Sequence, residues 1–174
     1  MADVLKRYVD SNVILQVGER HRSLYKYTKT IQFLTVFESD LVIGPVVATE
    51  VRYQIIGPER GKYKNHLSEI KDWLERPAHP SSTPQQANQI AELADAYRRA
   101  GWDGRGGDKG DREHAAFCSV HRISVLVTWE NRFAEQVELI SSTNRDQGIS
   151  HRLGIFKPDA CLESDFVDER ADGL

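Results

Sequence analysis

Short apolar runs alternate along the chain with stretches in which apolar residues recur every three or four positions. The run over residues 7–15, the run "LVI" that ends at Gly44, and the β-branched run "ISVLVT" each predict a buried strand. The run "RLGIF", just before Pro158, predicts the last strand. The pattern therefore predicts strands spread over most of the chain.

Amphipathic helices are predicted in the intervals between these runs. Pro45 and Pro84 each suit the first position of a helix, and Gly101 suits the end of one. Two helices are predicted from apolar residues at helical spacing, the first with Leu24, Tyr27, Ile31 and Leu34 and the second with Tyr63, Leu67, Ile70 and Trp73. Four more are predicted over 45 to about 56, over 84 to 101, from Asp111 onward, and over "NRFAEQVEL". Alternating strands and helices predict an α/β fold in which helices cover both faces of a mainly parallel sheet.

The chain has 174 residues, the length of a single domain. The segment "RPAHPSSTP" is the clearest linker, but the elements before it leave a sheet unfinished, so it is not predicted to separate two domains. We therefore expect one domain over 1–174, with additional helical and linker material near 57–84 and a less regular tail after 140.

Charge and cysteine content narrow the class of protein. The 23 basic and 26 acidic residues give a net charge of −3, which argues against binding of nucleic acid through bulk positive charge. Two cysteines, Cys118 and Cys161, are too few for a disulfide framework and favour a reducing compartment, so a cytoplasmic protein is expected. The longest apolar run, "LVIGPVVA", is far shorter than the roughly 18 residues that span a bilayer, and we expect no membrane contact.

Four carboxylates fall at predicted strand ends or on the helices that follow them. Asp10 interrupts an apolar run, Glu50 lies among valines in a helix, Asp111 begins a helix after a glycine-rich loop, and Glu130 follows Thr128 at the end of "ISVLVT". Each acid alone has an ordinary explanation, such as a helix cap for Asp111 or a turn for Glu130. In a parallel sheet, however, the carboxyl ends of the strands border the binding crevice, where these side chains would meet.

Carboxylates that meet in one cleft repel each other unless a cation neutralises them. Oxygen ligands favour Mg²⁺ or Mn²⁺, and bound Mg²⁺ keeps waters that can be activated or exchanged for phosphate oxygens. The four acids therefore predict a divalent-metal site suited to phosphodiester chemistry.

The same residues resemble the PIN-domain nucleases, most closely the toxin ribonucleases of the VapC type. The resemblance rests on four motifs in order, "VDSNVIL", "VVATEV", "GDREHAAFC" and "LVTWENRF", and covers most of residues 4 to 135. It implies a three-layer α/β/α sandwich and cleavage of RNA that depends on Mg²⁺ or Mn²⁺. It also implies two protein partners, a small antitoxin that inserts an element into the cleft and a second copy of the chain.

The resemblance gives each of the acids a role. Asp10, Glu50 and Asp111 would hold one metal ion, and Glu130 would complete the site or support a second ion, so that a metal-bound water attacks the phosphate in line with the leaving 3′ oxygen. Asn12 and Thr128 would orient the carboxylates, although hydrogen bonding at a strand end explains both residues equally well.

Some features depart from the family pattern. Glu130 stands where Asp or Asn is usual, and Asp108 competes with Asp111 for the position that faces the metal. Ala115 and Ala116 in the helix that follows favour Asp111. The chain is also longer than is typical of these toxins, with additional residues near 57–84 and 141–153. The extra length weakens the toxin assignment and leaves the nuclease interpretation unchanged.

Basic residues lie next to the predicted site acids. If the glycine-rich loop lies at the rim of the cleft, these residues would contact RNA phosphates, and a solvated loop is the alternative. The four candidates are Arg105, Lys109, Arg112 and Arg132.

Two other functions are alternatives. One is a PIN nuclease with a housekeeping role in RNA processing, and the other is a non-catalytic RNA- or protein-binding module that uses the acids as a structural cation site. A nucleotide-binding loop is rejected, because "GWDGRGGDKG" lacks the motif G-x-x-x-x-G-K-[ST]. His114, Cys118 and His121 share one helix face but have no fourth zinc ligand nearby, so a buried Cys118 is expected instead.

Overall fold

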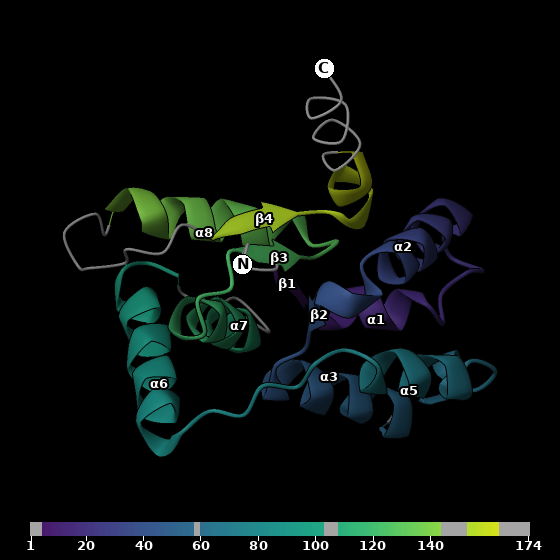
Figure 1. The fold of residues 1–174 in the computed structure, drawn as a ribbon, viewed down its shortest axis with the longest axis horizontal. Coiled ribbons are helices and arrows are strands. Elements are labelled where there is room, and N and C mark those ends of the chain that lie inside the picture. Colours follow the sequence, from purple (N-terminus) through teal and green to yellow (C-terminus); the bar gives the residue numbers. More distant parts are fainter. Residues whose placement is uncertain (1–4, 58–59, 103–107, 144–152, 164–174) are drawn as a thin grey trace.

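Four parallel strands form one sheet in the described part of the chain (Figure 1). The computed structural model describes residues 5–57, 60–102, 108–143 and 153–163. Tyr8 pairs with Val42 on one side and with Leu126 on the other. The strands are β1 (Arg7–Val9), β2 (Leu41–Val42), β3 (Val125–Val127) and β4 (Gly154–Phe156), in the order β2-β1-β3-β4. The prediction of a mainly parallel sheet is confirmed.

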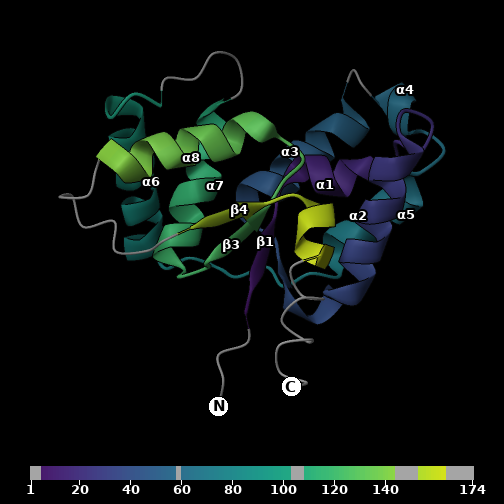
Figure 2. The same cartoon turned by 90° about the horizontal axis from the view of Figure 1, so that it is seen from above.

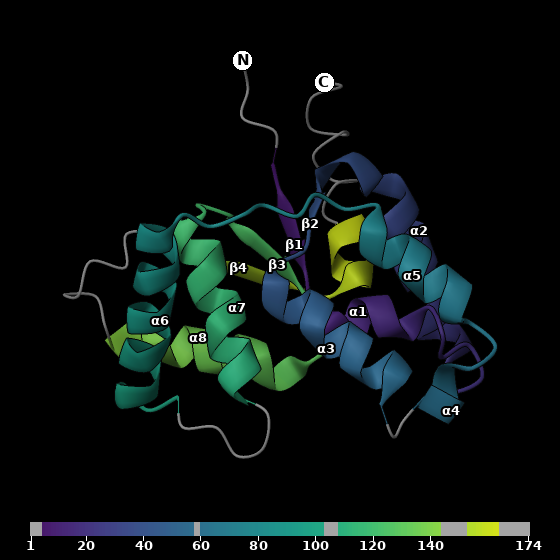
Figure 3. The ribbon, with the colours of Figure 1, turned by 90° about the horizontal axis from the view of Figure 1, so that it is seen from below.

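Helices cover both sides of this sheet and complete a three-layer α/β/α sandwich. α2 and α8 lie on one side, and α3, α6 and α7 lie on the other (Figures 2 and 3). Residues 158–163 are also helical, and none of the helices in the described ranges is long and apolar enough to cross a membrane. The helices are α1 (Ser11–Gln16), α2 (Leu24–Val36), α3 (Pro45–Ile56), α4 (Arg60–Tyr63), α5 (Leu67–Glu75), α6 (Pro84–Arg99), α7 (Asp108–Val120) and α8 (Asn131–Thr143), with a 3₁₀ turn at Glu38–Asp40.

Local sequence signals fix the starts of α2 and α6. The Thr83 hydroxyl accepts a hydrogen bond from the Gln86 backbone N–H, and the Gln86 side chain accepts one from the Thr83 N–H. Pro84 then occupies the first turn of α6. Ser23 caps α2 by accepting a hydrogen bond from the Lys26 N–H. The predicted helix that begins at Pro84 is therefore confirmed.

The hydrophobic core lies between the sheet and the helices. Tyr8, Val9, Leu126 and Val127 on the two central strands are fully buried. Full burial of one such aliphatic side chain contributes about 1.5–3 kcal/mol. Cys118 is also fully buried and carries a free thiol, which confirms the expectation of a buried cysteine on this helix.

The first strand is shorter than predicted. It ends at Val9, and the next residues form α1 (Ser11–Gln16), so the strand predicted over 7–15 is wrong beyond residue 9. Asp10 has extended backbone angles (φ −73°, ψ 155°), and its carboxylate accepts a hydrogen bond from the Ser11 N–H. Asp10 is therefore the N-cap of a helix, which starts where the sheet ends.

Gly44 lies where β2 leads into α3, and a side chain there is expected to destabilise the protein. A Cβ atom at Gly44 would lie 2.7 Å from the Tyr8 hydroxyl oxygen and 3.0 Å from Cε2 of the same ring. Because Tyr8 is fully buried, Gly44→Ala should lower the free energy of unfolding by about 1–3 kcal/mol. Urea unfolding measures this loss. Gly61→Ala is the control, because a Cβ there would meet nothing within 4 Å, and an equal loss in both variants would contradict the prediction.

Candidate functional site

The strand order places the ends of β1 and β3 at the centre of the sheet. From β1 the chain adds β2 at one side of the sheet, and it then adds β3 and β4 at the other side of β1. The order in which strands are added therefore reverses between β1 and β3. In open parallel sheets, ligands bind beyond the carboxyl ends of the strands at such a reversal. Asp10 directly follows β1, and Thr128 directly follows β3. Both residues therefore stand where a ligand is expected.

Asp10 is buried and is held by surrounding hydrogen-bond donors. Its Oδ1 accepts a hydrogen bond from the Ser11 N–H at 2.7 Å. Its Oδ2 accepts hydrogen bonds from the Asn12 amide at 2.9 Å and the Thr128 hydroxyl at 2.8 Å. Burial of a carboxylate would be unfavourable without such donors. These contacts fix the carboxylate in one orientation at the end of β1.

Asn12 and Thr128 join the ends of the two central strands. The Thr128 hydroxyl donates to Asp10 and accepts hydrogen bonds from the Asn12 amide at 2.9 Å and the Glu130 N–H at 3.0 Å. It thereby uses its one donor and both of its lone pairs. The Asn12 carbonyl oxygen accepts from the Trp129 N–H at 3.0 Å. The contacts that an orienting role requires are present, and the role itself stays a prediction.

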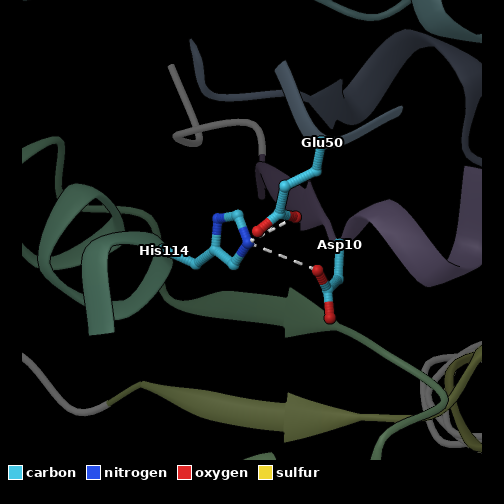
Figure 4. Close-up of side chains that lie close together, drawn as sticks. All are labelled: Asp10, Glu50 and His114. Atoms are coloured by element: carbon cyan, nitrogen blue, oxygen red, sulfur yellow. Dashed lines mark hydrogen bonds and ion pairs between the residues drawn. The ribbon is translucent and has the colours of Figure 1, made fainter. Parts of the chain in front are cut away.

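Two helices bring further side chains to Asp10 (Figure 4). Glu50 projects from α3 and His114 from α7. Nε2 of His114 lies 3.2 Å from Oε2 of Glu50 and 3.5 Å from Oδ1 of Asp10. We call Asp10, Glu50 and His114 the acid–histidine cluster. The His114 side chain is fully buried, whereas the Glu50 side chain is 34% exposed, so the cluster opens to solvent at Glu50.

Tyr8 contacts the other nitrogen of the imidazole ring. Its hydroxyl lies 2.8 Å from Nδ1 of His114 in a buried contact. A carboxylate can only accept, so Nε2 carries the proton in its hydrogen bond to Glu50. In the neutral ring Nδ1 accepts from the Tyr8 hydroxyl, and in the imidazolium it donates to Tyr8. In both forms the ring keeps Nε2 directed at the two carboxylates.

The charged forms of Glu50 and His114 stabilise each other. Burial lowers the pKa of His114, but the hydrogen bond to Glu50 and the negative charges of Asp10, Glu50 and Asp111 outweigh burial and hold this pKa above its ordinary value of 6.5. Burial raises the pKa of Glu50, but the hydrogen bond and charge of His114, with a hydrogen bond to Ser11, bring it below its ordinary value of 4.5. When His114 is protonated, its imidazolium therefore offsets the clustered negative charge of the metal-free site.

These shifts predict how the stability of the metal-free protein depends on pH. Because the folded-state pKa of His114 is raised, its contribution is complete below 6.5 and is lost as the pH rises through the folded-state pKa. The pKa of Glu50 is lowered, so its contribution is complete above 4.5 and is lost as the pH falls through the folded-state pKa. Urea unfolding in EDTA should show the full stabilisation by the Glu50–His114 pair between pH 4.5 and pH 6.5, and a smaller stabilisation at alkaline pH. A decline at alkaline pH that His114→Gln leaves unchanged would contradict this assignment.

The acid–histidine cluster fits a divalent metal ion. Asp10, Glu50 and His114 each offer one ligand atom, and the three atoms lie within 4.8 Å of one another. Metal–ligand bonds of about 2.0–2.2 Å at right angles would place neighbouring ligand atoms roughly 3 Å apart, close to the distances observed from Nε2. Coordination by Nε2 would displace the proton that this nitrogen donates to Glu50. The ring proton would then lie on Nδ1 and be donated to the Tyr8 hydroxyl, the kind of partner that a metal-binding histidine usually has on its second nitrogen.

The other predicted acids lie outside this cluster. Asp111 precedes His114 by one turn on the same face of α7, and its charge contributes to the raised pKa of His114. Glu130 is exposed, and its carboxylate accepts a 3.4 Å hydrogen bond from the Arg132 N–H at the start of α8. α7 begins at Asp108, three residues earlier than predicted, and the Asp108 side chain lies outside the described residues. Metal binding by Asp111 and Glu130 stays a prediction.

The predicted RNA-binding residues have different surroundings. Arg112 donates a 2.7 Å hydrogen bond to the backbone carbonyl of Trp102, which connects α7 to the segment that follows α6. Arg132 is exposed in the first turn of α8. Arg105 and the side chain of Lys109 lie outside the described residues. Contact between these four residues and RNA therefore stays a prediction.

Tyr8 was not among the predicted site residues, and His114 was considered only as a zinc ligand together with Cys118 and His121. One sequence signal could have identified His114. It lies three residues after Asp111 on one helix, and this spacing places both side chains on the same helix face. The zinc site considered for this helix gains no support, because His114 faces the acids and His121 stacks on Phe117 instead.

Comparison with known proteins agrees with this geometry. None of the curated proteins compared with the chain matches it. Residues 7–139 match the PIN domain family, and this range includes all three members of the acid–histidine cluster. PIN domains are typically nucleases. Because the match covers well over half of its length, the chain belongs to the PIN domain family.

Proposed function

We propose that the protein is a metal-dependent endoribonuclease that hydrolyses phosphodiester bonds in RNA. The observation that carries this proposal is the acid–histidine cluster, in which two carboxylates and an imidazole converge beside the carboxyl ends of β1 and β3 of a PIN domain. The proposed ion is Mg²⁺ or Mn²⁺. Carboxylates suit both ions, and the imidazole nitrogen favours Mn²⁺ as the softer of the two.

Asp10, Glu50 and His114 would hold this ion directly. A divalent ion bound there would polarise the scissile phosphate and lower the pKa of a bound water. The hydrogen bonds from Asn12 and Thr128 keep the Asp10 carboxylate in place while substrate and product exchange. Glu50 lies at the open side of the cluster, so the phosphate would enter past Glu50.

Asp111 is the proposed acceptor of the proton from the attacking water. It is partly exposed and lies one turn of α7 away from His114. A carboxylate that does not bind the ion can take up a proton without releasing the ion from the cluster. Glu130, at the start of α8, is the proposed support for a second ion.

The toxin function is the more specific form of this proposal. The order of the four sequence motifs supports it, and it implies an antitoxin and a second copy of the chain as partners. The low cysteine content, two residues that are both buried, supports a cytoplasmic location. A housekeeping role in RNA processing is the second candidate, because the additional segment 57–84 contains α4 and α5, which bury Tyr63 and Ile70 in the core. Growth arrest on expression would favour the toxin.

Removal of divalent ions is expected to abolish RNA cleavage. The purified protein should cleave a mixed pool of single-stranded RNA with Mn²⁺, more slowly with Mg²⁺, and not at all with EDTA, because the clustered ligands need the ion to activate water. Excess Mn²⁺ added to the EDTA sample should restore cleavage. Cleavage that persists in EDTA would contradict the proposal. RNA that stays intact with every ion, although the protein is folded, would favour the non-catalytic binding module.

A further inference from the structure

A cavity of about 420 Å³ lies beside the acid–histidine cluster. Its walls come from β1, α3, α6, α7 and the segment that leads into α6. The residues that matter for its chemistry are Tyr8, Val46, Ser82, Ile90, Glu113 and Phe117. A volume of this size lies within the range of small-molecule sites.

The cavity and the cluster share a wall. Tyr8 lines the cavity, and its hydroxyl contacts His114 Nδ1 at 2.8 Å. Val46 lines the cavity from α3, one turn before Glu50 on the same helix face. Glu113 lines it from α7 and directly precedes His114. A group bound in the cavity would therefore lie next to a phosphate held at the cluster.

The lining suits a flat aromatic ring with hydrogen-bond donors. Phe117, Ile90 and Val46 provide apolar surface, as in most small-ligand sites. Glu113 contributes the charged group of the lining, and Ser82 contributes a hydroxyl that also bonds to His121. The lining residues, all of them in the described part of the chain, include no lysine or arginine, so a phosphate is disfavoured inside the cavity.

We propose that the cavity binds the base of a nucleotide adjacent to the cleaved bond and prefers guanine to uracil. The proposal rests on the ribonuclease function proposed above. Guanine presents two neighbouring N–H donors on its Watson–Crick edge to the Glu113 carboxylate, and adenine and cytosine present an amino group. Uracil presents a single N–H between two carbonyl oxygens, which the carboxylate repels. Glu113 thus sets the order of preference, and the apolar walls hold the ring.

Binding of single nucleotides in EDTA tests the cavity without nuclease chemistry. The probes are the four ribonucleoside 5′-monophosphates, and the reporter is the NMR signal of the Ile90 methyl group, which lines the cavity. Guanosine monophosphate should shift this signal and bind at least about 10-fold more tightly than uridine monophosphate. Glu113→Gln, which keeps the shape of the side chain and removes its charge, should bring the two affinities together.

Two tryptophan substitutions on α6 form a matched pair. Ala87 lines the cavity and is exposed, so Ala87→Trp fills the cavity without disturbing the core. Gln89 is exposed on the same helix and is not part of the lining. Ala87→Trp should weaken binding of guanosine monophosphate at least about 10-fold and remove the preference for guanine beside the cut, while Gln89→Trp should change neither.

The outcomes separate this proposal from the ribonuclease function. Equal affinity for all four nucleotides, or binding that Ala87→Trp leaves unchanged, would overturn base recognition by the cavity. Failure of every nucleotide to bind would also overturn it and would favour an apolar side chain of a protein partner as the occupant. RNA cleavage without base preference would overturn the cavity proposal alone. Nucleotide binding without RNA cleavage under any metal ion would overturn the ribonuclease function and with it the stated role of the cavity.

Discussion

Replacement of Asp10 with asparagine is expected to lower the rate of RNA cleavage at least about 100-fold. Asparagine keeps the shape of the side chain but removes one negative charge from the proposed ligands of the ion. It also replaces one acceptor oxygen with an N–H donor. If this donor takes the place of Oδ2, it faces the donors of Asn12 and Thr128, and if it takes the place of Oδ1, it faces the ion and the Ser11 N–H. Initial rates at saturating Mn²⁺ measure the loss.

Asp95→Asn is the matched control for this substitution. Asp95 is a surface carboxylate on α6 that pairs with Arg98 and Arg99, so its substitution should leave the cleavage rate unchanged. Circular dichroism and urea unfolding establish that each variant is folded. A folded Asp10→Asn protein that keeps more than about a tenth of the wild-type rate would show that Asp10 is not a ligand of a catalytic ion.

Replacement of His114 with glutamine is expected to weaken Mn²⁺ binding at least about 10-fold. The reason is that Nε2, directed at both carboxylates and oriented by Tyr8, is the proposed third ligand. The direction of the effect separates two roles of His114. If the imidazolium served only as a positive charge in the place of the ion, its removal would free the two carboxylates and strengthen Mn²⁺ binding.

Calorimetric titration with Mn²⁺ measures the effect, with His121→Gln as the control, a histidine that directly follows α7. His121 lies outside the acid–histidine cluster and stacks on Phe117, so its substitution should leave Mn²⁺ affinity unchanged. Tyr8→Phe keeps the imidazole and removes the partner of Nδ1, so it should weaken binding by a smaller factor than His114→Gln. Tighter Mn²⁺ binding by folded His114→Gln would contradict coordination by His114.

The segment after β1 shows why one element was predicted wrongly. The apolar run from Val13 to Leu15 is too short for its period to distinguish a strand from a helix. The deciding signal is local, because the Asp10 carboxylate accepts the Ser11 N–H and thereby caps α1. The other strands and the helix starts at Pro45 and Pro84 could be predicted, since composition and proline position indicate them directly.

The candidate site could be predicted only where a residue directly follows a strand. Asp10 and Thr128 are of this kind, and the parallel order of β1 and β3 brings them together. Glu50 and His114 meet because α3 and α7 pack closely, and a Cβ at Gly110 would already contact the Glu50 carboxylate. Such a contact between helices about 60 positions apart is set by tertiary packing, and no local spacing encodes it.

Mn²⁺ occupancy and RNA cleavage, measured on the same samples, test the central claim most directly. Increasing amounts of Mn²⁺ are added to the wild-type protein and to Asp10→Asn, bound Mn²⁺ is counted by electron paramagnetic resonance, and the initial cleavage rate is recorded at each step. We expect the wild-type rate to rise in step with the filling of a site that Asp10→Asn lacks. A rate that does not depend on bound Mn²⁺, or Mn²⁺ binding that Asp10→Asn leaves unchanged, would contradict the assignment of the acid–histidine cluster as a catalytic metal site.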